Sequence, residues 1–365
     1  MKGNFEEHGG NIWEFAKKNH CKPSEVLDFS SNLNEFTKID LSEFLMNNEA
    51  LRSYPDTNTG SYLKPLADYV HLDLENMLLG PGLTYLIYRV NQLFYGSRVA
   101  IVEPAFSEHK KSALINHSMV YEAMWNREDA KEDLLLRLGR INYDLLFITN
   151  PSNPVGDLVS ENDLEAIIDL NHKKHALTFI DEAFIDFVNF RKASFQRRMI
   201  GDYGDVIFGR SLTKLFGFAS IRLGYLLSSR EILMKIEKLM EPWTVGQYAL
   251  NLINSINYNT FKKLPFLVEK EREFTANRLI SMGFQIISRP RANFFCAIPP
   301  KNINAHYLAS ELAGNRILVK EVKIPYERRR IALRFAVKTR DKNKVLIDTI
   351  QEIVKKHMPK ISGRE

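Results

Sequence analysis

Short apolar runs alternate with amphipathic stretches between residues 60 and 245. Several runs are apolar throughout and rich in β-branched residues, which is typical of strands covered on both faces of a sheet. The amphipathic windows at 82–96 and 160–175 predict helices between such runs, the second with Ser160 and Asp163 as a capping pair. The alternation predicts an α/β domain with a mostly parallel sheet. The predicted strands lie within 97–106, 117–125, 143–151, 175–184, 205–212 and 221–229.

The pattern changes after residue 230. Long helical stretches are followed by short strand-like segments, and this segregation predicts a smaller α+β domain. The stretches are 231–240 and 262–283, and the segments are 292–299, 316–322 and 330–339. Residues 1–50 have too few apolar positions to form a core of their own, so we expect them to join another domain. We therefore expect a large cofactor-binding domain over 45–245 and a small one built from 1–44 and 246–365.

The composition is that of an ordinary globular protein. Of 365 residues, 45% are hydrophobic and 26% are charged, which excludes a disordered, collagen-like or coiled-coil chain. The net charge of +6 is small for this length and fits an anionic small substrate as well as a nucleic acid. Cys21 and Cys296 lie far apart, so neither a disulfide framework nor a metal site is expected.

No stretch of the sequence predicts secretion or membrane insertion. The first residues carry two glutamates and a glycine pair where a signal peptide would have an apolar stretch. No later run approaches the roughly 18 apolar residues of a membrane helix. We therefore expect a soluble, cytoplasmic protein with no membrane partner.

Polar motifs follow three of the predicted strands, where the functional residues of an open α/β sheet are expected. They are N-P-S-N-P-V-G at 150–156, Asp181-Glu182, and S-L-T-K at 211–214. Each motif alone is more often structural, since Asn-Pro is usually a surface turn, a strand-end Asp a helix cap and such a Lys solvated. Their order and spacing, with Arg222 eight residues after Lys214, make one recognisable set.

This set resembles the fold-type I pyridoxal-phosphate enzymes over almost the whole chain. Within that superfamily the sequence resembles histidinol-phosphate aminotransferases and, more closely, the threonine-phosphate decarboxylases of cobalamin biosynthesis. The closer match rests on H-G-G-N at 8–11, D-F-S-S-N-L-N at 28–34 and D-E-A-F-I-D-F at 181–187. The resemblance implies an α/β, aminotransferase-like fold with a large, mostly parallel sheet and a smaller α+β domain.

The resemblance also implies the residues that hold pyridoxal 5'-phosphate. Lys214 stands where the family lysine binds the cofactor aldehyde. Asp181 stands where a carboxylate keeps the pyridine nitrogen protonated; at about 4 Å it is worth roughly 4 kcal/mol at an effective dielectric of 20, or about three pKa units. Asn153 matches the donor to the ring hydroxyl, and Phe106 matches the stacking ring, although it also suits the core.

Further cofactor positions form the phosphate cup, where helix-start N–H groups and a cation bind the anion. The matching residues are Gly82, Leu83, Thr84, Ser211 and Arg222. The G-P-G-L-T motif at 80–84 differs from a Rossmann G-x-G-x-x-G, so no dinucleotide site is expected. Tyr54 matches a tyrosine that reaches the phosphate from the neighbouring subunit, which implies a homodimer with a shared active site.

The substrate residues implied by the resemblance decide between the two reactions. Arg334 stands in a motif whose arginine binds the α-carboxylate in the aminotransferases, so it does not separate them. His8 takes part in the decarboxylase, and Asn32 and Asn153 belong to the same pocket. Lys320 replaces the usual arginine for the substrate phosphate and lacks its bidentate fork. Phe184 replaces a tyrosine of many of the aminotransferases, which favours the decarboxylase.

The main hypothesis is therefore the removal of carbon dioxide from L-threonine O-3-phosphate or L-serine O-phosphate, giving a phosphorylated amino alcohol for a corrinoid. One methyl group is worth only about 1–3 kcal/mol of selectivity, so the sequence leaves that choice open. The alternative is histidinol-phosphate aminotransferase, which needs a 2-oxoacid. A third hypothesis is a non-enzymatic nucleic-acid-binding module that uses the basic cluster at 326–330, although such clusters are usually solvated surface.

Overall fold

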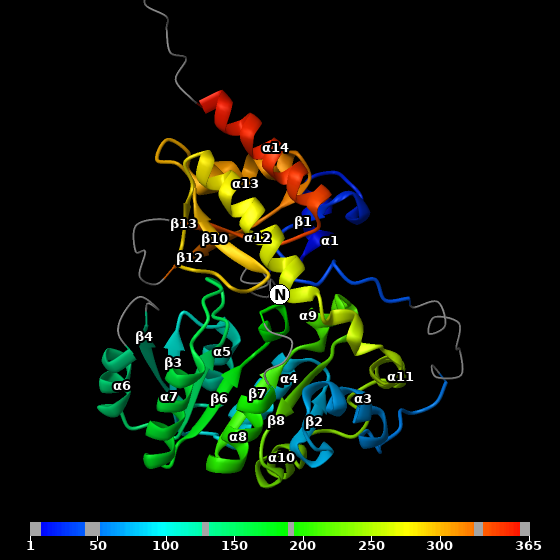
Figure 1. Ribbon diagram of the computed structural model, residues 1–365, viewed down its shortest axis with the longest axis vertical. Helices are drawn as coiled ribbons and strands as arrows, with labels where there is room; N and C mark the ends of the chain where they lie inside the picture. Colours follow the sequence, from blue (N-terminus) through cyan, green and yellow to red (C-terminus); the bar gives the residue numbers. More distant parts are fainter. Residues whose placement is uncertain (1–8, 41–51, 126–130, 189–192, 325–330, 358–365) are drawn as a thin grey trace, which may run out of the picture. The chain divides into compact units, whose positions relative to one another are not determined.

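The structure divides the chain into two units. The computed structural model describes residues 9–40, 52–125, 131–188, 193–324 and 331–357 (Figure 1). The large unit contains the described residues within 33–153 and 157–266, and the small unit those within 1–32, 154–156 and 267–365. The domain limits expected from the hydrophobic pattern stay a prediction.

A seven-stranded sheet forms the large unit, as the sequence pattern predicts. Its order is β2-β8-β7-β6-β5-β3-β4; β8 runs antiparallel to both of its neighbours, and the other pairs are parallel. The six predicted strands are confirmed, and β2 is an additional edge strand. The strands are β2 (Met77–Gly80), β3 (Arg98–Glu103), β4 (Met119–Met124), β5 (Leu145–Thr149), β6 (Leu177–Asp181), β7 (Val206–Arg210) and β8 (Gly224–Leu227).

Helices cover both faces of this sheet (Figure 1). Every residue of β5, β6 and β7 is buried, as expected of strands covered on both faces. The helices of the large unit are α3 (Gly60–Val70), α4 (Leu83–Leu93), α5 (Ser107–Ile115), α6 (Lys131–Gly139), α7 (Glu161–Lys173), α8 (Ala193–Tyr203), α9 (Leu212–Phe216), α10 (Arg230–Glu237) and α11 (Gln247–Ser255). Ser160 caps α7 as predicted, because its Oγ accepts the Asp163 N–H at 3.2 Å.

The apolar face of α4 anchors that helix to the sheet. Leu86, Ile87 and Val90 are fully buried in one cluster with Phe147 and Phe179 of the central strands. Burying a side chain of this kind contributes about 1.5–3 kcal/mol. The first turn of α4 is thereby fixed where β2 ends, at the carboxyl end of the parallel strands.

The small unit contains an antiparallel sheet of order β12-β13-β10-β9 and a parallel pair, β1-β11. This is the smaller α+β domain predicted from the segregated pattern. Its strands are β1 (Leu27–Asp28), β9 (Gln285–Ile286), β10 (Phe294–Ile298), β11 (Ile317–Leu318), β12 (Lys320–Lys323) and β13 (Ile331–Ala336). Its helices are α1 (Ile12–Lys18), α13 (Ala305–Gly314) and α14 (Arg340–His357), together with most of α12 (Leu264–Ser281). Among the described residues, no helix is both long and apolar enough to cross a bilayer.

Candidate active site

The first turn of α4 and Arg222 lie close together in the large unit. Gly82 precedes α4 with a φ of 93°, and no side chain of the described residues caps the helix. A Cβ at Gly82 would lie 2.9 Å from Nη2 of Arg222, and one at Gly224 would lie 2.3 Å from the Leu83 nitrogen. Both glycines are therefore required for the close approach. The structure brings Gly82, Leu83, Thr84 and Arg222 together, and helix N–H groups beside a guanidinium suit a phosphate.

Lys214 lies half-buried on α9, a short helix that starts after Ser211 at the end of β7. Two buried residues fix this helix. Thr213 accepts the N–H of Leu223 at its Oγ1 (2.9 Å) and donates its own N–H to the Leu223 carbonyl (3.0 Å), which ties α9 to the residue after Arg222. Asn34 donates its backbone N–H to the Lys214 carbonyl at 3.1 Å and its side-chain amide to the Leu215 carbonyl at 2.8 Å.

Asp181 lies at the end of β6 and is only 2% exposed. One carboxylate oxygen accepts the Ala183 N–H at 2.9 Å, and the other lies 3.1 Å from Nε2 of His109. His109 is fully buried; its ring stacks on Phe147 and meets Phe106 edge-on, with ring centroids 5.8 Å apart. His109 thus connects Asp181 with Phe106, and the sequence analysis missed it. Its signal was its place three residues after Phe106, in the first turn of α5, the helix that Phe106 precedes.

The N-P-S-N-P-V-G loop is held by its first asparagine. The side chain of Asn150 accepts the Val159 N–H at 2.7 Å, and Ser152 donates its N–H to the Asp157 carbonyl at 2.8 Å. These bonds fix the strand-end segment that carries Asn153, which is half-buried. The role of Asn153 stays a prediction.

A buried ion pair joins the ends of β6 and β7, next to Asp181 and Ser211. Nε of Arg210 donates to Glu182 at 2.9 Å, and both side chains are almost fully buried. Gln196 donates to the second Glu182 oxygen at 2.7 Å. Desolvation raises the pKa of Glu182, and Arg210 opposes that rise. Asp186 lies in the same buried region and accepts a hydrogen bond from the Tyr69 hydroxyl at 2.8 Å.

Tyr54 lies on the surface of the large unit with 79% of its area exposed. Its ring contacts Trp243, with centroids 4.7 Å apart. The contact of Tyr54 with a neighbouring subunit stays a prediction.

Phe184 is buried, and the centroid of its ring lies 6.4 Å from that of the Phe187 ring.

The predicted substrate residues of the small unit include two cations on adjacent strands. Lys320 and Arg334 are directly opposite each other in the β12–β13 pair. Nη2 of Arg334 donates to the Ser30 carbonyl at 2.6 Å, and its guanidinium lies over the Phe294 ring at 5.5 Å. Burial lowers the pKa of the Arg334 guanidinium. Electrostatic interaction with Cys296, and to a smaller extent with Asp28, raises it.

The N-terminal motifs meet the same part of the small unit. Gly10 donates its N–H to Ser30 Oγ at 2.7 Å, and a Cβ at Gly9 would lie 2.1 Å from the Ser30 carbonyl oxygen. Asn32 is buried, and its Oδ1 has no hydrogen-bond partner in the part of the chain that the structure describes. His8 and the basic cluster at 326–330 lie outside the described residues.

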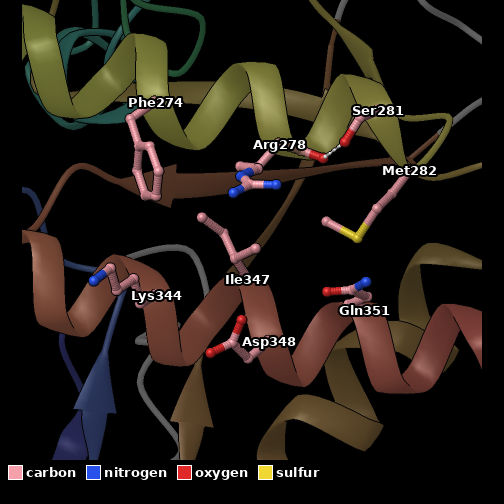
Figure 2. Close-up of a pocket in the computed structure, with 8 residues that line it drawn as sticks. All are labelled: Phe274, Arg278, Ser281, Met282, Lys344, Ile347, Asp348 and Gln351. Carbon is pink, nitrogen blue, oxygen red and sulfur yellow. Dashed lines mark hydrogen bonds between the residues drawn. The ribbon is translucent and has the colours of Figure 1, made fainter.

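A surface pocket of the small unit lies between α12 and α14 (Figure 2). It contains none of the predicted site residues. It is lined by Phe274, Arg278, Ser281, Met282, Lys344, Ile347, Asp348 and Gln351.

The chemical groups of the large unit fit pyridoxal 5'-phosphate. An uncapped helix start beside a guanidinium suits the phosphate, a buried carboxylate suits a protonated ring nitrogen, and a half-buried lysine on a fixed helix suits an aldehyde. Gly82 leaves room that any Cβ would fill. When bound, this cofactor accepts the electron pair of a bond broken at the substrate α-carbon.

Comparison with known proteins agrees with this chemistry. The family model for aminotransferases of class I and II matches residues 24–350. The threonine-phosphate decarboxylase of Salmonella typhimurium is 30% identical over 249 residues, which are 66% of this chain and 67% of that protein. The histidinol-phosphate aminotransferase of Bacillus cytotoxicus is 24% identical over 96% of this chain and 95% of its own length.

A solved structure shares the fold. The histidinol-phosphate aminotransferase of Sinorhizobium meliloti, solved in complex with pyridoxal-5'-phosphate, has a TM-score of 0.81 at 17% identity, over 95% of each chain. The aminotransferase-like fold expected from the sequence is therefore confirmed, and so is the expected cofactor. The chain belongs to the aminotransferase class I and II family and is a pyridoxal-phosphate-dependent enzyme.

Proposed function

We propose that the protein decarboxylates an O-phospho-L-amino acid, either L-threonine O-3-phosphate or L-serine O-phosphate, to the phosphorylated amino alcohol of a corrinoid side chain. The observation that carries the proposal is the pairing of Lys320 with Arg334 across β12 and β13. Like charges directly opposite each other destabilise a sheet. Two cationic side chains at opposite positions of one strand pair suit an anionic ligand, and a phosphoamino acid offers both a carboxylate and a phosphate.

Each cation then has a separate task in the proposal. Arg334 binds the α-carboxylate through its planar guanidinium, whose fork matches a carboxylate. Lys320 binds the substrate phosphate as a point charge, and His8 and Asn32 complete the pocket. Together they would orient the substrate so that its bond to the carboxylate, rather than its bond to the α-hydrogen, is the one that the cofactor activates.

The large-unit residues hold the cofactor in this proposal. Lys214 would hold the cofactor through its aldehyde, and Asp181 would keep a proton on the ring nitrogen. Asn153 donates to the ring oxygen, and Phe106 stacks on the ring.

The cofactor phosphate is bound by Arg222 and the first turn of α4 together with Ser211. Tyr54 reaches the phosphate of the neighbouring subunit in a homodimer, the usual assembly of fold-type I enzymes.

A second candidate is histidinol-phosphate aminotransferase, because relatives of both kinds match the chain. Phe184 favours the decarboxylase, since many of the aminotransferases carry a tyrosine there and the decarboxylases a phenylalanine.

Two coupled assays separate the candidates. The holoenzyme is incubated with each phosphoamino acid and carbon dioxide is measured; in parallel, it is incubated with histidinol phosphate and 2-oxoglutarate and glutamate is measured. The proposal predicts carbon dioxide from a phosphoamino acid and no glutamate. Lys320→Ala should then lose roughly 30-fold or more in kcat/KM, since truncating one partner of a buried charge pair costs about 2–5 kcal/mol, while cofactor binding stays intact. Glutamate without carbon dioxide would replace the proposal with the aminotransferase.

A further inference from the structure

We infer that Lys338 is a positioning residue for the substrate pocket, because it fixes Ser31 and thereby Asn32. The inference rests on the proposed function of Asn32 and Arg334. Lys338 has no role in the sequence analysis, which places it near the end of the strand-like segment 330–339 and gives it no contact.

Lys338 is a buried cation next to the predicted substrate residues. Its side chain is only 2% exposed, and its Nζ donates to the Ser31 carbonyl at 3.2 Å. Arg334 donates to the preceding carbonyl, that of Ser30, at 2.6 Å. Two cations therefore hold two successive carbonyl groups. The next residue is Asn32, whose buried Oδ1 has no partner among the residues that the structure describes.

The backbone of Lys338 is fixed as firmly as its side chain. Its N–H donates to the Asn343 side chain at 3.1 Å, and Asn343 donates back to the Lys338 carbonyl at 2.7 Å. Asn343 is fully buried. The backbone of Lys338 is therefore rigid. A change in its side chain should move Ser31, because the backbone at residue 338 does not shift to compensate.

Asp28 holds the same turn from its other side. Asp28 accepts hydrogen bonds from the backbone N–H and the hydroxyl of both Ser30 and Ser31, at 2.6 to 3.2 Å. Asp28 is also the carboxylate that acts on Arg334. Asp28 therefore holds the two serines from their N–H and hydroxyl groups, while Arg334 and Lys338 hold them from their carbonyl groups. The position of Asn32, the next residue, thus depends on the bond from Lys338 to Ser31.

The test compares three variants of the holoenzyme. Lys338→Met removes the charge and the bond to Ser31 at similar volume, and Lys338→Arg keeps both. Lys344→Met removes an exposed charge from α14, the helix that follows Lys338, at the surface pocket (Figure 2). We measure kcat and KM for O-phospho-L-threonine and O-phospho-L-serine, the Kd of each by calorimetry, and the pH titration of the cofactor absorbance.

Lys338→Met should raise KM and Kd at least 10-fold for both compounds, with a smaller change in kcat and an unchanged cofactor titration. Lys338→Arg should restore the affinity to within about 3-fold of the wild type, and Lys344→Met should match the wild type. A purely structural lysine would lower thermal stability and leave KM and Kd of the folded enzyme unchanged; that result overturns the inference. If Lys338→Met does not fold, Lys338→Gln takes its place.

Failure of the proposed function is a separate outcome. If the wild type binds the phosphoamino acids but releases no carbon dioxide, the decarboxylase proposal is wrong, and the change in Kd still decides the role of Lys338. If the wild type binds neither compound, both the proposed function and this inference are wrong.

Discussion

Replacing Arg210 with methionine should destabilise the large unit more than replacing Arg210 and Glu182 together. In the wild type, Glu182 accepts hydrogen bonds from Arg210 at 2.9 Å and from Gln196 at 2.7 Å, in a region closed to solvent. Arg210→Met leaves a buried carboxylate without its cation, which costs about 3–5 kcal/mol. A combined Arg210→Met and Glu182→Gln variant has no charge at either residue, and its amide oxygen still accepts from Gln196; Asp186 stays buried nearby and keeps its hydrogen bond from Tyr69. It should lose only about 1–2 kcal/mol.

Thermal unfolding of the cofactor-free variants at pH 7.5 measures this difference. In a unit of this size one kcal/mol corresponds to about 2–4 °C, so Arg210→Met should lower Tm by roughly 6–20 °C and the double variant by roughly 2–8 °C. Desolvation raises the pKa of Glu182 and Arg210 lowers it, so the variant carboxyl has a higher pKa still. A raised folded-state pKa stabilises the fold at low pH and loses that effect as pH rises through it. The deficit of Arg210→Met should therefore shrink at pH 5.5.

Three results would refute this reasoning. They are a Tm change below about 2 °C for Arg210→Met, a double variant as unstable as the single one, and a deficit that grows on acidification. The first would mean that Glu182 is reached by water, and the second that the destabilisation comes from lost packing rather than from an unpaired charge. The third would contradict the raised pKa of Glu182.

Three further predictions concern the cofactor and the buried acids. Borohydride reduction of the holoenzyme and peptide mapping should place the phosphopyridoxyl group on Lys214; label on another lysine would overturn the site assignment. Phe184→Tyr should lower the pKa of the cofactor absorbance titration, because a hydroxyl would join Asn153 in stabilising the charged ring oxygen; an unchanged titration would place residue 184 away from the ring. Tyr69→Phe should cost about 1–3 kcal/mol at pH 8 and less at pH 5.5. Burial raises the pKa of Asp186 and the hydrogen bond from Tyr69 lowers it, so loss of that bond lets the pKa rise further. Urea unfolding at both pH values checks this, and a pH-independent loss would exclude the carboxylate as the cause.

The fold was predictable because its central strands are buried on both faces. Runs such as 145–149 and 177–181 are apolar almost throughout, so their period and length identify parallel strands without further information. The edge strand β2 was missed, since Met77–Gly80 is too short to show a pattern. Ser160 was found as a cap because its partner lies three residues away.

The site was predictable only where motif spacing carries the chemistry. Lys214, Asp181 and Arg222 were placed by spacing and by resemblance to a family. Asn34 and Lys338 were not, because each acts on a residue that is distant in the sequence, Lys214 and Ser31 respectively. Such contacts depend on the tertiary fold and leave no periodic signal in the chain.

The measurement that tests the proposed function most directly follows a single bond of the substrate. The holoenzyme is incubated in D2O with O-phospho-L-threonine carrying carbon-13 at the carboxyl carbon, and the mixture is observed by NMR. The proposal predicts that the label leaves as carbon dioxide and bicarbonate, while the carbon that held it gains one deuterium from solvent. Label that stays on the amino acid while its α-hydrogen exchanges for deuterium would contradict it, because the bond to hydrogen would then be the one that this enzyme breaks.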